Sequence, residues 1–120
     1  IKPFVDSLDH RVMFAEKSWG SFRVLDVGKE SLTIKVTLNP GHSMNYHSHD
    51  HREEVWTVIQ GTGRAIIGIK EQVVGVGEVI TMPAGSRHTI IAEKDLQLKE
   101  VQIGKDISVY DKHKHELERV

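Results

Sequence analysis

The 120-residue chain contains no cysteine, so disulfide bonds and thiolate ligands are excluded, and a bound metal ion must be held by histidine and carboxylate groups. A strong charge of one sign is also missing. The formal net charge is -1, which argues against nucleic acid or an anionic membrane surface as the main partner. No run of about 18 apolar residues predicts a membrane-spanning helix, and no signal-peptide pattern is present. We therefore expect a cytoplasmic protein.

What the chain does contain is typical of one soluble globular domain. Hydrophobic residues make up 38% of the sequence and charged residues 28%, which is an ordinary balance for such a domain. A chain of 120 residues is long enough to bury one hydrophobic core. We expect three parts: an N-terminal extension at 1–17, the domain proper at 18–104 and a charged C-terminal tail at 105–120.

The domain is predicted to consist of short β-strands. In the segment 32–39, three aliphatic residues alternate with Thr33, Lys35 and Thr37, the period-2 pattern of a strand that is buried on one face. Similar short segments, bounded by Gly, Pro or charged turns, lie at 22–26, 54–59, 64–69, 72–76, 78–82, 88–92 and 96–103. Helical periodicity is almost absent. The pattern indicates an all-β sandwich or barrel.

Four residues in this framework have the chemistry and spacing of a metal site. His47 and His49 are two residues apart, so both imidazoles point to the same face of a strand. After a polar turn, Glu54 opens the next strand, and His88 follows a Pro-Ala-Gly turn. Three imidazoles and one carboxylate suit Zn, Fe, Mn, Ni or Co. The alternative interpretation is four unrelated polar residues on a sheet surface.

The spacing around these groups resembles the two sequence motifs of the cupin superfamily. The first motif is matched by Gly41, His47, His49, Glu54 and Gly61, and the second by Gly77, Pro83, Gly85 and His88. The one departure is Ala92, where the second motif usually has Asn. The resemblance implies a double-stranded β-helix, or jelly roll, with a divalent metal ion held by His47, His49, Glu54 and His88. Zn²⁺ is our first expectation.

Further matches resemble the cupin domain of type II mannose-6-phosphate isomerases, which often forms the C-terminal part of bifunctional isomerase/mannose-1-phosphate guanylyltransferases. They are Trp19-Gly20 within 17–25, His49-x-His51-Arg52-x-Glu54-x-Trp56, the segment 83–88, Glu100-Val101-Gln102-x-Gly104, and the residues 106–107 and 110–111. Two positions depart from the family: it usually has Gln at His47 and often His at Val55. No guanylyltransferase domain is present in these 120 residues, so we do not expect that activity of this chain. The resemblance also allows the chain to be part of a longer protein with a nucleotidyltransferase domain.

This resemblance implies an isomerase that interconverts mannose 6-phosphate and fructose 6-phosphate. A divalent metal ion would polarise the sugar oxygens at C1 and C2. His51 is our candidate for the base that moves the proton, and its alternative role is a solvated loop histidine. Arg52 is our candidate for binding the phosphate group, since guanidinium binds phosphate bidentately. Its alternative role is a surface salt bridge.

Two other functions are compatible with the same sequence features. A metal-dependent oxygenase could use the same ligand set, and a sugar-binding or nucleotide-sugar-binding module could use the fold without turnover. We also expect a homodimer, because the N-terminal extension carries more apolar surface than a free tail normally exposes. Its apolar residues are Phe4, Val5, Leu8, Val12, Met13 and Phe14.

Overall fold

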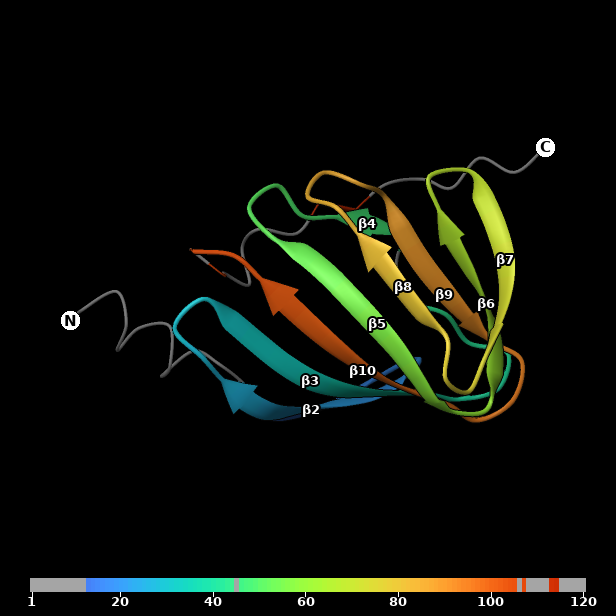
Figure 1. Ribbon diagram of the computed structural model, residues 1–120. Helices are drawn as coiled ribbons and strands as arrows, with labels where there is room; N and C mark the ends of the chain where they lie inside the picture. The colour runs from blue at the N-terminus through green and yellow to red at the C-terminus, as the bar shows by residue number, and fades with distance from the viewer. Residues whose placement is uncertain (1–12, 45, 106, 108–112, 115–120) are drawn as a thin grey trace.

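The computed structural model describes residues 13–44, 46–105, 107 and 113–114 (Figure 1). Within these residues the chain forms strands and no helix, which confirms the all-β prediction. The strands are β1 (Phe14–Lys17), β2 (Gly20–Val27), β3 (Ser31–Leu38), β4 (His47–Ser48), β5 (Glu53–Gln60), β6 (Thr62–Ile67), β7 (Lys70–Gly75), β8 (Val79–Met82), β9 (His88–Ala92), β10 (Leu96–Ile103) and β11 (His113–Lys114). None of the described segments is a helix that could cross a membrane.

The strands form two antiparallel sheets that face each other across the core (Figure 1). We call the six-stranded sheet, with the order β1-β2-β3-β10-β5-β8, the large sheet, and the five-stranded sheet, with the order β11-β4-β9-β6-β7, the small sheet. Consecutive strands often change sheet, as β4 and β5 do. This arrangement is the double-stranded β-helix that the cupin resemblance implied. The sheets do not close, because β8 and β7 remain as edge strands.

Alternation along the strands of the large sheet creates the core. On β3, Leu32, Ile34, Val36 and Leu38 are buried, and the residues between them are more exposed. The pattern predicted for 32–39 is therefore confirmed. On the neighbouring strand β10, inward and outward positions alternate in the same way over Leu96–Ile103. Since the side-chain period of a strand is two, each strand presents one face to the core and one to solvent.

At two positions of the matched motifs, the backbone conformation and a neighbouring carbonyl group allow only glycine. Gly20 and Gly61 have φ angles of 153° and 80°, a region that residues with a Cβ rarely adopt. A Cβ on Gly20 would overlap the carbonyl oxygen of Thr37, and a Cβ on Gly61 would overlap that of Asp95. These glycines let adjacent chain segments approach closely at the start of β2 and at the β5–β6 turn.

The segments predicted as an N-terminal extension and a C-terminal tail also contribute strands to the sheets. β1 lies within the segment we assigned to the N-terminal extension, and it pairs with β2 at the edge of the large sheet. β11 lies within the predicted C-terminal tail, and it pairs with β4 at His47 and Ser48. Residues 1–12 of the extension and most of the tail lie outside the described residues.

Candidate metal centre

The four candidate ligands gather at one place between the two sheets. His47 lies on β4, His49 directly follows that strand, Glu54 lies on β5 and His88 opens β9. All four are buried, and one potential ligand atom from each lies within 4.8 Å of the others. His47 and His88 are direct partners across β4 and β9. The strand pairing therefore brings together residues that are far apart in the sequence.

The three imidazole rings are packed against one another. The ring centre of His47 lies 4.8 Å from that of His49 and 4.4 Å from that of His88, and the His49 and His88 centres are 5.5 Å apart. The turn before His88 fixes the loop that carries His49, because the amide of Gly85 donates a hydrogen bond of 2.7 Å to the His49 carbonyl. The second cupin motif thus positions a candidate ligand of the first.

The Glu54 carboxylate, which is 1% exposed, is surrounded by nitrogen atoms. Its Oε2 lies 3.0 Å from His49 Nε2 and 3.0 Å from Arg52 Nε, and its Oε1 lies 3.4 Å from His88 Nε2. Burial alone would raise the pKa of Glu54. The close contacts with His49 and His88 and the charges of His49 and Arg52 instead hold this pKa well below its usual range. Glu54 is therefore a carboxylate, the form that binds a metal ion.

The donor set fits a divalent metal ion. Glu54 Oε1 and His88 Nε2 are buried and have no hydrogen-bond partner, although they face each other at 3.4 Å. Buried polar atoms without a partner are rare and costly, and a cation between them would satisfy both. On the other side of the His88 ring, Nδ1 contacts the Ser86 carbonyl at 3.0 Å. A backbone acceptor at one ring nitrogen leaves the other free for a metal.

Arg52, the residue predicted to bind phosphate, lies against the ligands. In addition to its contact with Glu54, an Nη2 atom of Arg52 lies 3.1 Å from His49 Nε2, and the side chain is 9% exposed. Arg52 is thus engaged in an ion pair, as the alternative interpretation proposed, but the pair is buried and involves a candidate ligand. His51, the predicted base, is exposed on the same loop and is not one of the four clustered groups.

A row of buried, hydrogen-bonded polar side chains lies next to the cluster, and the sequence analysis predicted no role for it. Glu100, 5% exposed, accepts hydrogen bonds from Trp56 Nε1 at 2.9 Å and from Gln102 Nε2 at 2.7 Å. The Trp56 ring in turn lies edge-on to His88, with ring centres 5.4 Å apart. Burial and then the negative charge of Glu54 raise the pKa of Glu100 to about 8. The sequence did carry a signal, because Glu100 and Gln102 fall at inward positions of an alternating strand.

Solved structures show the same fold in other proteins. An uncharacterised double-stranded β-helix protein from Klebsiella pneumoniae superposes with a TM-score of 0.71 and 18% identity, over 79% of this chain and 83% of that one. An RmlC-like cupin from Shewanella frigidimarina superposes with a TM-score of 0.67 and 16% identity, over 74% and 81% of the two chains. These likenesses identify the cupin fold.

Sequence comparison gives the narrower relationship. The chain is 31% identical over 83 residues to mannose-1-phosphate guanylyltransferase 2 of Escherichia coli O157:H7, covering 69% of this chain and 17% of the relative. It is 28% identical over 97 residues to the xanthan biosynthesis protein XanB of Xanthomonas campestris, covering 79% and 20%. The chain thus spans a fifth or less of the length of these curated relatives. Residues 6–116 match the family model described as mannose-6-phosphate isomerase C-terminal, and the chain belongs to that family of cupin domains.

Proposed function

We propose that this domain is a metal-dependent sugar-phosphate isomerase that interconverts mannose 6-phosphate and fructose 6-phosphate. The observation that carries the proposal is the buried cluster of three imidazoles and one carboxylate, with two buried ligand atoms that have no hydrogen-bond partner. Membership of the isomerase C-terminal family supports the choice of substrate. His47, His49, Glu54 and His88 would hold the ion, with Zn²⁺ the first expectation and Fe, Mn, Ni or Co the alternatives.

When bound, the ion would polarise the sugar oxygens at C1 and C2 and stabilise negative charge that develops on them. The chain's own residues have two further tasks. His51 takes the carbon-bound proton from C2 of the aldose on its ring nitrogen and returns it to C1. The hydroxyl proton at C2 passes to the oxygen at C1, which completes the ketose. Its exposed place on the loop beside the cluster supports this role, because the substrate must enter from solvent.

Arg52 binds the phosphate group, which lies at the opposite end of the sugar from the reacting carbons. In this structure its guanidinium contacts His49 Nε2 and Glu54 Oε2, two atoms of the proposed ligand set. A metal ion and the guanidinium compete for these atoms because both are cationic. Arg52 is therefore expected to turn toward the substrate side when the ion is bound.

The test is a coupled isomerase assay on mannose 6-phosphate, with the metal content measured on the same sample. The proposal requires activity that rises with metal occupancy and disappears on chelation. Metal-loaded protein without activity would refute the isomerase assignment.

A second candidate is a non-catalytic module that binds a sugar or nucleotide sugar within a longer protein. It is favoured by the fact that the matched region makes up a fifth or less of the length of the curated relatives. An inert protein whose melting temperature rises with a sugar phosphate or nucleotide sugar would support it. Oxygen uptake by an iron-loaded sample would instead identify the third candidate, an oxygenase.

A further inference from the structure

A row of cations crosses the solvent-facing side of the large sheet. Arg23 on β2 is the direct partner of Lys35 on β3, and Lys35 is the direct partner of Lys99 on β10. Lys35 lies between the buried residues Ile34 and Val36, so the row is on the face opposite to the core and the metal cluster. Three positive side chains therefore stand side by side on three adjacent strands.

Nothing among the described residues neutralises this row. None of the ion pairs formed by those residues involves Arg23, Lys35 or Lys99. Like charges at directly opposite positions of neighbouring strands destabilise a sheet. Because the described part of the chain offers these three cations no carboxylate partner, a ligand is a candidate source of the negative charge.

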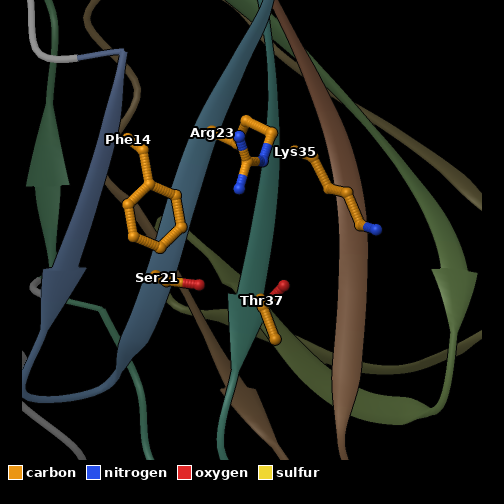
Figure 2. Close-up of a pocket in the computed structure, with 5 residues that line it drawn as sticks. All are labelled: Phe14, Ser21, Arg23, Lys35 and Thr37. Atoms are coloured by element: carbon orange, nitrogen blue, oxygen red, sulfur yellow. The ribbon is translucent and has the colours of Figure 1, made fainter.

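The first two cations of the row border a shallow pocket of about 220 Å³, which is also lined by Phe14, Ser21 and Thr37 (Figure 2). The guanidinium of Arg23 is stacked on Phe14, 4.8 Å from the ring centre, and in Figure 2 it lies above the gap between the two hydroxyl groups. Stacking on an aromatic ring restricts a guanidinium and leaves its N–H edge available for hydrogen bonds. In the same view the Lys35 side chain points away from Arg23.

We propose that this outer-face cluster, made of Ser21, Arg23, Lys35 and Thr37, binds the phosphate group of a small phosphorylated ligand. Arg23 donates two parallel hydrogen bonds to phosphate oxygens, the geometry that guanidinium favours. Lys35 turns toward the same group, and the hydroxyls of Ser21 and Thr37 donate to the remaining oxygens. A phosphate dianion neutralises Arg23 and Lys35 and removes the repulsion between their side chains.

The site is independent of the metal centre and of the proposed isomerase activity. Among the described residues that line this pocket and the adjoining one, one is acidic. Glu16 on β1 is the partner of Ser21 and lines the adjoining pocket together with Ser21 and Thr37. Its negative charge opposes anion binding, so its removal should strengthen the interaction. The effect of Glu16→Gln on phosphate affinity should therefore be opposite to that of Arg23→Gln.

The test is a titration of the ¹⁵N-labelled chain with inorganic phosphate, followed through the amide signals of 20–24 and 35–37. Sodium chloride at matched ionic strength is the reference. Saturable shifts of these signals in phosphate, absent in chloride, are expected. Arg23→Gln should weaken phosphate binding about tenfold or more because it removes charge-assisted hydrogen bonds. Glu16→Gln should strengthen it, and His49→Ala, which alters the metal centre, should leave it unchanged.

Lys94→Gln is the matched control, because Lys94 is exposed in the β9–β10 turn, outside the row. Equal weakening by Lys94→Gln and Arg23→Gln would indicate general screening and would overturn the proposal. Identical shifts in chloride would do the same. A poly-glutamate peptide that shifts these signals at concentrations where phosphate has no effect would show that the surface takes an acidic protein segment instead.

Discussion

Replacement of Glu100 with Gln tests the buried polar chain beside the metal cluster. The side chain keeps its size, and its carbonyl oxygen can still accept the hydrogen bond from Trp56 Nε1. Its amide group needs an acceptor, which Gln102 can offer by turning its own amide around. That turn would also pair Gln102 Oε1, which is buried and has no partner in the present arrangement. The cost of turning the Gln102 amide does not vary with pH, so the pH dependence of the difference reports the titration of the carboxyl group.

The size of the effect follows from the pKa of Glu100. In the folded protein this pKa is raised from its usual value of 4.5 to about 8, so the folded state holds the proton more tightly than the unfolded state. The stability that this proton contributes is fully present below about pH 4.5 and is lost as the pH rises toward 8. At about 1.4 kcal/mol per pKa unit, the loss amounts to about 3 kcal/mol by pH 7.

The assay is urea denaturation of the metal-free protein between about pH 5 and pH 8, followed by tryptophan fluorescence. The free energy of unfolding of Glu100→Gln minus that of the wild type should grow by about 2 to 3 kcal/mol between pH 5 and pH 7. Glu93→Gln, a change at an exposed turn, controls for the loss of a carboxylate. A difference that stays flat with pH would refute the reasoning. A bound cation offsets the charge of Glu54, so the metal-loaded protein should show a smaller slope.

Three further outcomes are expected. His49→Ala should remove most of the bound metal, because it deletes one of four ligands, and unchanged metal stoichiometry by elemental analysis would contradict the assignment. Arg52→Ala should keep its metal yet lose about tenfold to a hundredfold in kcat/KM on mannose 6-phosphate, with weak turnover of unphosphorylated mannose unaffected; an equal loss on both sugars would mean that Arg52 supports the loop instead. The chain should sediment as a homodimer at micromolar concentration, since Met13 and Phe14 of the extension are 53% and 44% exposed, and a monomer would count against this.

Local patterns in the sequence were sufficient for the strands and for the candidate ligands. The alternation over 32–39 identified β3 because one face of that strand is buried along its whole length. The spacing of His47, His49 and Glu54 identified the cluster because they lie on or directly beside two strands joined by a short turn. His88 was included because it follows a Pro-Ala-Gly turn, and the resemblance of the surrounding glycines and proline to a known motif strengthened that assignment.

Features that depend on which strands are neighbours could not be predicted. Alternation shows that Glu100 points inward, but its pairing with Trp56 requires the register of β10 against β5, two strands separated by more than thirty residues. The row of Arg23, Lys35 and Lys99 likewise appears only when β2, β3 and β10 are adjacent. The contact of Arg52 with Glu54 is local, but the sequence offered no way to choose between this partner and a phosphate group.

The placement of the ligands on both sheets has a mechanical consequence. Glu54 belongs to the large sheet, whereas His47 and His88 belong to the small one, so an ion held by all of them would be a cross-link between the two layers. It would close a chain loop between positions 47 and 88, and by the chain-entropy estimate used for disulfides a loop of this length is worth about 4 kcal/mol. The chain has no cysteine, and its sheets remain open along β7 and β8. Such an ion would therefore link the two layers as a disulfide bond does in other proteins.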